Sequence, residues 1–203
     1  EAPAEPRPPR PLAPSAAAED DGSEPPPRPE MRAAAQRGKL LHALFERLPD
    51  VPEADRRSVA DRWLERSAGI ADGAQRAALV DDSCRIISDP AFADLFGPEA
   101  LAEAPIAAVV AGGHVVSGTV DRLVVTEERV LVADFKTGRT VPSDPARIPV
   151  PHLRQMAAYL AALRIIFPER KVEAALLYTS GPRLHLLPEA LLAPYAPATA
   201  AAA

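Results

Sequence analysis

Two carboxylates and one amine fall on what the sequence predicts to be neighbouring strands. Asp121 lies within HVVSGTVDRLVVT, whereas Asp134 and Lys136 lie within VLVADFKTG. Because side chains alternate across a strand, Asp134 and Lys136 point to one face, and a hairpin can bring Asp121 beside them. Carboxylate oxygens suit Mg²⁺ or Mn²⁺, so this group is suited to holding a metal ion against a phosphate.

Lysine is rare in this chain, which draws attention to position 136. The sequence has 20 arginines but only three lysines, at positions 39, 136 and 171. An ammonium group is a compact charge whose pKa shifts readily on burial, whereas a guanidinium stays protonated. Lys136 is therefore suited to positioning a water molecule or helping to deprotonate it.

A simpler interpretation of these residues is also open. Asp134 and Lys136 also fit the exposed end of a hairpin, where they would form a weak surface salt bridge. Against this, charged side chains pack poorly in a strand interior, and such departures from a local pattern tend to mark function. The spacing alone does not decide between the two.

Four other polar residues carry little information when each is taken alone. His42 borders the apolar face of a predicted helix, where a partly buried structural histidine is common. Glu103 precedes Pro105 at the entry to the first predicted strand, as a solvated loop carboxylate would. Gln155 and Tyr159 are four residues apart and share one side of a helix, which is also the pattern of an ordinary polar helix edge.

Several other kinds of site are disfavoured. Cys84 is the one cysteine in the sequence, which excludes an intrachain disulfide and a four-cysteine zinc or iron–sulfur site. The four histidines show no paired metal-ligand spacing. Ser117 and Ser180 lack the glycine-flanked turn of a nucleophilic serine.

The elements that must position these residues can be read from periodicity. Helical spacing of apolar residues predicts helices over about 37–48, 53–67, 73–87 and 151–167. Strands are expected at 106–111, 114–126 and 130–138, joined by short turns as an antiparallel meander, and again at 172–179 and 183–188. This order predicts a mixed α/β fold with a central sheet and an N-terminal helical layer.

Composition divides the chain into two parts. Ten of the 24 prolines and seven acidic residues fall in the first 30 positions, which have too little apolar content to fold and predict a disordered, acidic linker over 1–30. Residues 31–203 are expected to form a single domain with 20 basic and 21 acidic residues, which does not favour a general polyanion binder. With no apolar run long enough for a membrane span, we expect a cytoplasmic protein.

Taken together and in order, the polar motifs resemble those of one nuclease group. Gly38…His42, Glu103, Gly118-Thr-Val-Asp121, Asp134-Phe-Lys136-Thr-Gly and Gln155-x-x-x-Tyr159 are similar to the motif set of RecB-type nucleases of the PD-(D/E)xK superfamily. Within that group they resemble the C-terminal nuclease domain of AddA, the helicase-nuclease subunit of the AddAB complex. The resemblance spans about residues 37–180 and implies a restriction-endonuclease-like mixed sheet flanked by helices.

The resemblance also implies roles for the metal-site residues. Asp121 and Asp134 would bind Mg²⁺, with Mn²⁺ as a substitute, together with the main-chain carbonyl of Phe135. His42 would be an additional metal-site residue from the helical layer. Relatives that carry an iron–sulfur cluster need four cysteines, so none is expected here.

The remaining motif residues would act around that metal. By resemblance, Lys136 is the catalytic lysine and Glu103 is an acidic residue that supports the site. Gln155 and Tyr159 match a Q-x-x-x-Y motif that arranges the site and the DNA strand.

The partners follow from the same resemblance. They would be DNA, a superfamily 1 helicase region preceding the linker in the same polypeptide, and an AddB-like subunit. The protein would then act at the nucleoid in the repair of double-strand breaks by homologous recombination. Two alternatives stay open: a catalytically inert nuclease-like docking module, and a free-standing RecB-like nuclease.

Overall fold

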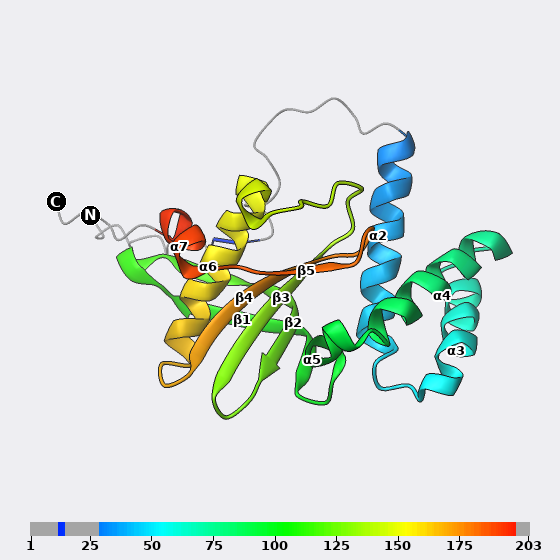
Figure 1. Cartoon of the computed structure of the whole chain (residues 1–203), viewed down its shortest axis with the longest axis horizontal. Coiled ribbons are helices and arrows are strands. Elements are labelled where there is room, and N and C mark those ends of the chain that lie inside the picture. Colours follow the sequence, from blue (N-terminus) through cyan, green and yellow to red (C-terminus); the bar gives the residue numbers. More distant parts are fainter. Residues whose placement is uncertain (1–11, 15–28, 198–203) are drawn as a thin grey trace, which may run out of the picture.

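A five-stranded mixed sheet forms the centre of the fold (Figure 1). The computed structural model describes residues 12–14 and 29–197. The strands lie in the order in which they occur in the sequence, and only the pairing of the third with the fourth is parallel. They are β1 (Ala100–Val109), β2 (Val115–Val125), β3 (Arg129–Lys136), β4 (Lys171–Tyr178) and β5 (Arg183–Leu186). The first three strands form the predicted antiparallel meander.

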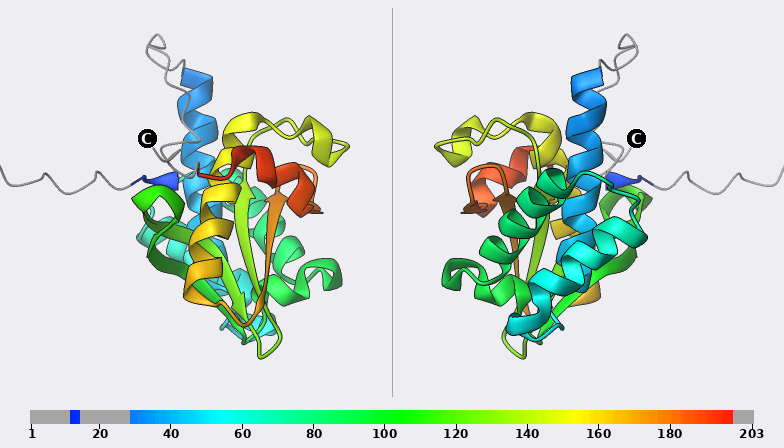
Figure 2. Two further views of the ribbon diagram at one scale, coloured as in Figure 1. Left: turned by 90° about the vertical axis from the view of Figure 1, so that its left-hand side faces the viewer. Right: turned by 90° about the vertical axis from the view of Figure 1, so that its right-hand side faces the viewer.

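Helices cover both faces of this sheet, as Figures 1 and 2 show. On one face, α6 connects β3 to the parallel β4 and packs on the even-numbered residues of β3. On the other face, the helices that precede the sheet pack on the odd-numbered residues of β3. The helices are α2 (Pro29–Arg47), α3 (Glu53–Arg66), α4 (Gly73–Ile87), α5 (Ala93–Phe96), α6 (Val150–Ile166) and α7 (Glu189–Leu192). The predicted mixed α/β fold with an N-terminal helical layer is therefore confirmed.

Helix α2 begins earlier than the sequence pattern predicts. Leu41, Leu44 and Phe45 are fully buried at helical spacing, as expected. The first two turns, however, run from Pro29 through residues 31–36, all of which are exposed. A helical segment without a buried face leaves no apolar periodicity to detect, so the prediction placed the start near residue 37.

Strand β1 also begins earlier than predicted, and it includes Glu103. The segment before Pro105 is rich in alanine and has no β-branched residue, so it does not look like a strand. Proline is tolerated there because β1 is an edge strand that pairs with β2 alone. Glu103 is therefore a strand residue and not, as the simpler interpretation had it, a loop carboxylate.

A short piece of the predicted linker pairs with the sheet. The Leu12 amide donates to the Val115 carbonyl at 2.6 Å, and the Ser117 amide donates to the Leu12 carbonyl at 3.1 Å. This part of β2 is free to pair because β3 contacts only the last four residues of that strand. Most of the linker predicted over 1–30 lies outside the described residues. Within the described ranges, no helix is long and apolar enough to cross a membrane.

A glycine sets the distance between α2 and the end of β3. Gly38 is buried, and a Cβ atom at this position would collide with the Thr137 hydroxyl. We therefore expect Gly38→Ala to lower the free energy of unfolding by about 1–3 kcal/mol, the usual cost of overpacking. Urea denaturation monitored by circular dichroism measures this change.

Two further variants test whether the collision is the cause. Gly73→Ala is the matched control, since a Cβ there would meet only the end of the Arg76 side chain at 3.9 Å. Combining Gly38→Ala with Thr137→Ala should restore most of the lost stability. If the single variant is as stable as the wild type, α2 does not depend on this close approach.

Candidate active site

The site lies where β2 and β3 separate. Their last paired residues are Arg122 and Ala133, so the next residues along the strands, Asp121 and Asp134, stand at the opening. In place of a backbone partner, the Phe135 amide donates to Asp121 Oδ2 at 2.6 Å. The Asp121 side chain thus continues the ladder of hydrogen bonds by one step and fixes the end of β3.

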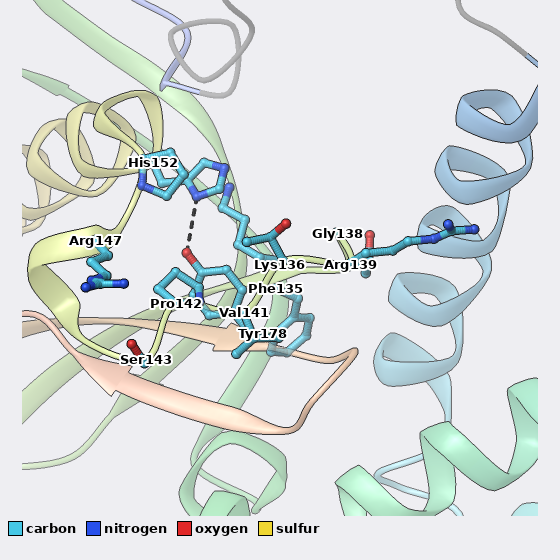
Figure 3. Close-up of a pocket in the computed structure, with 13 residues that line it drawn as sticks. Phe135, Lys136, Gly138, Arg139, Val141, Pro142, Ser143, Arg147, His152 and Tyr178 are labelled. Carbon is cyan, nitrogen blue, oxygen red and sulfur yellow. Dashed lines mark hydrogen bonds between the residues drawn. The ribbon is translucent and has the colours of Figure 1, made fainter.

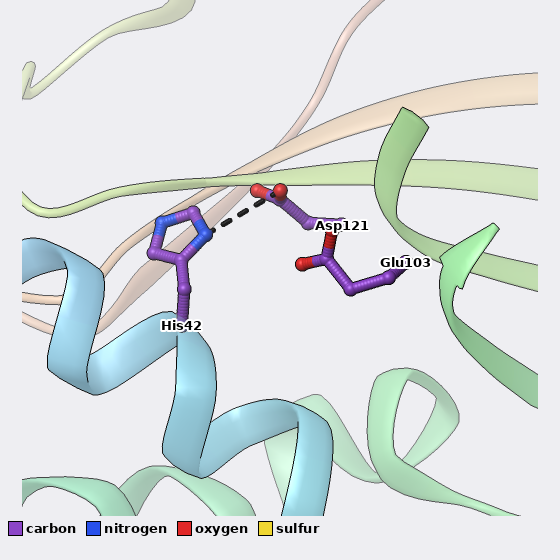
Figure 4. A group of neighbouring side chains, drawn as sticks. All are labelled: His42, Glu103 and Asp121. Carbon is purple, nitrogen blue, oxygen red and sulfur yellow. Dashed lines mark ion pairs between the residues drawn. The ribbon is translucent and has the colours of Figure 1, made fainter. Parts of the chain in front are cut away.

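Three possible metal ligands meet beside this opening (Figure 4). Donor atoms of His42, Glu103 and Asp121 lie within 4.8 Å of one another. Oxygen or nitrogen atoms bound to one Mg²⁺ at about 2.1 Å lie up to about 4.2 Å apart, so small side-chain rotations suffice to place them around one ion. Two carboxylates and an imidazole are suitable donors for Mg²⁺ or Mn²⁺.

His42 joins two parts of this group with its two ring nitrogens. Nδ1 lies 3.4 Å from Asp121 Oδ1, and Nε2 lies 3.1 Å from the carbonyl oxygen of Phe135. Burial lowers the pKa of His42, but the hydrogen bond and charge of Asp121, with help from Asp134 and the Phe135 carbonyl, outweigh it and raise the pKa overall. The Phe135 carbonyl therefore lies at the edge of the same group.

Glu103 adopts an unusual backbone conformation for a strand residue. Its φ is 47°, in the left-handed region that side chains other than glycine rarely adopt. The paired residues on either side, Ala102 with Arg122 and Ala104 with Val120, leave Glu103 and Asp121 between them. Burial and the neighbouring Asp121 charge raise the pKa of Glu103. A strained backbone conformation at a residue whose carboxylate lies close to a second one is typical of a functional site.

A second cluster lies on the α6 side of β3. Lys136 Nζ is 2.8 Å from Asp134 Oδ2 and donates to Gln155 Oε1 at 2.7 Å. The Gln155 amide donates in turn to Asp134 Oδ1 at 2.8 Å. The three side chains form a closed triangle, and the ammonium group is held in place by two partners.

Asp134 is placed differently from the other predicted metal ligands. Both of its carboxylate oxygens already have partners, and it does not belong to the group of His42, Glu103 and Asp121. Its even-numbered position on β3 directs it toward α6, whereas the Phe135 side chain packs among the helices of the opposite face. Direct ligation by Asp134 would require one of its oxygens to leave Lys136 or Gln155.

Tyr159 lies one turn beyond Gln155 and is fully buried. Its hydroxyl donates to the Thr119 carbonyl at 3.0 Å, and its ring approaches Gly118. It therefore supports the part of β2 that leads into Asp121. These contacts do not place Tyr159 among the possible metal ligands, and its role in arranging the site stays a prediction.

Arg122 is a supporting residue that the sequence analysis did not single out. It is 3% exposed, donates to the Phe45 carbonyl, and lies over the Phe96 ring at 5.3 Å. Burial lowers its pKa. Arg122 follows Asp121 directly in β2 and therefore links this part of the strand to the helical layer that carries His42. The available signal was an arginine directly after Asp121 inside an apolar strand, because arginine is rarely buried without a partner.

The Asp134 carboxyl should make stability depend on pH in the metal-free protein. Burial and the nearby Asp121 charge, partly offset by Lys136, raise the pKa of Asp134 to about 6. Because this pKa is higher in the folded than in the unfolded chain, the carboxyl favours folding at acid pH, and the contribution is lost as the pH rises through about 6. In EDTA, the free energy of unfolding of the wild type should therefore fall, relative to Asp134→Asn, between pH 4 and 7. Urea titrations of both proteins at several pH values measure this difference. The same pH dependence in the wild type and in Asp134→Asn would contradict a raised pKa of Asp134.

Comparison with known proteins identifies the family of this chain. A family model described as the PD-(D/E)XK nuclease superfamily matches residues 16–194. No curated protein matches the chain. A solved structure entitled "Crystal structure of SSO0001" is 18% identical, with a TM-score of 0.33 and a match that covers 81% of this chain and 83% of that one; a likeness at this score adds nothing further. Since the family model spans most of the sequence, the chain belongs to the PD-(D/E)XK nuclease superfamily.

Proposed function

We propose that this domain hydrolyses phosphodiester bonds in DNA with the help of a divalent metal ion, Mg²⁺ or Mn²⁺. The observation that carries the proposal is the convergence of two clusters at one opening of the sheet. His42, Glu103 and Asp121 make an anionic group on one side, and Lys136 is fixed by Asp134 and Gln155 on the other.

The first cluster would hold the metal. Asp121, Glu103, His42 and the Phe135 carbonyl are the groups within reach, and Asp134 would join them by releasing one of its present partners. A bound divalent ion supplies charge for the scissile phosphate and lowers the pKa of a bound water molecule. Burial, and after it the charge of Asp121, raises the pKa values of Glu103 and Asp134, and a bound cation would offset this concentration of negative charge.

Lys136 would act on the reacting groups. Its ammonium group is held by Asp134 and Gln155, so little motion is needed to orient a water molecule or to stabilise the negative charge that develops on the phosphate. In-line attack would leave a 5′-phosphate and a 3′-hydroxyl, as the family resemblance implies.

The wider role is also a proposal. The order of the motifs resembles AddA, and the proline-rich first 30 residues suit a tether to a superfamily 1 helicase region acting with an AddB-like subunit in recombinational repair at the nucleoid. A near-neutral domain has little charge of its own to attract DNA, which fits a nuclease to which a motor delivers the strand.

The central test is metal-dependent cleavage by the purified chain. End-labelled single-stranded and double-stranded DNA should be cut in Mg²⁺ or Mn²⁺ and left intact in excess EDTA. Calorimetric titration with Mn²⁺ gives a second, independent readout. A chain that neither binds Mn²⁺ nor cuts DNA would instead favour the inert docking module.

A further inference from the structure

A cavity of about 590 Å³ opens beside Lys136 (Figure 3). It is lined by the loop over 137–149, the first turn of α6 and the ends of β3 and β4. Its volume falls in the range of small-molecule sites, about 300–1,000 Å³. None of the residues described above as metal-site carboxylates lines it.

Side chains of β5 and of the turn before it hold the loop that forms one wall, through hydrogen bonds to the backbone carbonyls of the loop. The Pro142 carbonyl accepts from His185 Nε2 at 3.0 Å and from Arg183 Nη1 at 3.4 Å. Arg183 also donates to the Ser143 carbonyl at 3.3 Å, and Ser180 donates to the Thr137 carbonyl at 3.3 Å. These bonds tie the loop to β5 and to the turn before it, so the cavity is formed without a ligand.

The charged side chains that line the cavity are all basic. They are Lys136, Arg139 and Arg147, with no aspartate or glutamate among the lining residues. Within the described ranges, neither arginine makes an ion pair or a side-chain hydrogen bond. Figure 3 shows Arg147 at one end of the cavity, whereas Arg139 extends toward α2. Both arginines are exposed, so an anionic ligand that enters the cavity can pair with either of them without breaking a contact within the protein.

His152 adds a neutral hydrogen-bonding group to this lining. Burial, and then the charge of Lys136, lowers the pKa of His152 to about 4, so the ring is uncharged near neutral pH. Burial raises the pKa of Tyr178 to about 12, which keeps its phenol protonated. The phenol oxygen lies 3.4 Å from His152 Nδ1, so Nδ1 already has a hydrogen-bond partner in Tyr178. Nε2 makes no hydrogen bond with any described residue, which leaves this nitrogen able to bind a ligand as donor or as acceptor.

Apolar side chains complete the walls. Val141, Pro142 and Pro149 line the cavity together with the His152 ring. A ligand that satisfies this lining has a body that packs on apolar side chains, polar edges that can hydrogen-bond, and an anionic group, which is the chemistry of a nucleotide. Because the cavity begins at Lys136, a DNA strand whose phosphate lies at the metal cluster can place a neighbouring residue in it.

We infer that this cavity binds the nucleotide next to the scissile phosphate of the DNA strand, with Arg147 on its phosphate and His152 Nε2 on its base or sugar. The inference rests on the proposed nuclease activity. By holding that nucleotide, the loop over 137–149 would determine which phosphodiester bond of the strand is cut.

The first test needs no cleavage. In EDTA, calorimetric titration of the wild type with 2′-deoxyadenosine 5′-monophosphate should show binding, and deoxyribose 5-phosphate, which lacks the base, should bind about tenfold more weakly. Arg147→Ala should weaken nucleotide binding about tenfold. Arg147 is exposed, so this variant is expected to fold, and Arg66→Ala, an exposed arginine at the end of α3, is the matched control. Equal binding of the two ligands, or an unchanged Arg147→Ala, overturns the inference.

The second test locates the cavity relative to the cut. A set of end-labelled strands, each with one abasic residue at a different position, is digested in Mg²⁺. The wild type should cut the bond beside an abasic residue less often than the other bonds. This difference between bonds should be smaller for His152→Ala. If no strand is cut, the proposed nuclease activity is contradicted. The nucleotide titration then still tests whether the cavity binds a nucleotide. Uniform cutting past abasic residues by an active wild type overturns the inference alone.

Discussion

Replacing Asp121 by asparagine is expected to abolish metal binding and to reduce DNA cleavage by about 10³-fold or more, the loss typical of removing charge stabilisation from a transition state. Asp121 lies beside both of the other possible metal ligands: it contacts His42 and lies opposite Glu103. Asparagine keeps an oxygen to accept from the Phe135 amide, so the end of β3 should stay in place. The substitution therefore removes charge with little change of structure.

Calorimetric titration with Mn²⁺ and a gel-based cleavage assay measure the two effects. Asp81→Asn is the matched control, because Asp81 is an exposed aspartate that pairs with Arg57 on the helical layer. The control should bind Mn²⁺ and cut DNA like the wild type. Undiminished Mn²⁺ binding by Asp121→Asn would place the metal elsewhere and remove the basis of the proposed mechanism.

Replacing Lys136 by methionine is expected to reduce cleavage by about 10²–10³-fold while Mn²⁺ binding persists. Methionine keeps the length and apolar stem of lysine but loses the ammonium group that Asp134 and Gln155 hold. Lysine is not a metal ligand here, so binding and cleavage should separate in this variant, unlike in Asp121→Asn.

The pH dependence of this variant distinguishes a direct from an indirect role. Lys136 also lowers the pKa of Asp134, so its loss would leave Asp134 protonated to a higher pH. Assays from pH 6 to 9 settle the point: if activity recovers to the wild-type level at high pH, Lys136 acts only through Asp134. Lys171→Met is the control, since that lysine is 74% exposed on its side chain.

The sheet and its hairpin were predictable because their residues obey simple rules. The β-branched runs around Asp121 and Asp134 indicate strands, and alternation alone puts Asp134 and Lys136 on one face. The structure bears this out, with Lys136 and Asp134 2.8 Å apart. The choice between a metal site and a surface salt bridge could not come from this spacing; it depended on the whole set of motifs.

Other features of the site depend on tertiary contacts that leave no local trace. Neither the left-handed conformation of Glu103 nor the approach of its carboxylate to Asp121 can be read from an alanine-rich segment. Similarly, the spacing of Gln155 and Tyr159 shows that they share a helix face, but not that Gln155 binds Asp134 whereas Tyr159 binds a carbonyl of β2. Such pairings are set by how α6 crosses the sheet.

The wide spread of the site along the chain has a consequence for synthesis of the protein. His42 comes from the first described helix, whereas Gln155, which fixes Lys136, comes from the last long one. Because a chain emerges from the ribosome N-terminus first and domains fold as units, both clusters can be complete only after α6 has been translated. We therefore expect an unfinished nascent chain to be harmless to DNA, so that cutting begins only once the whole domain has folded.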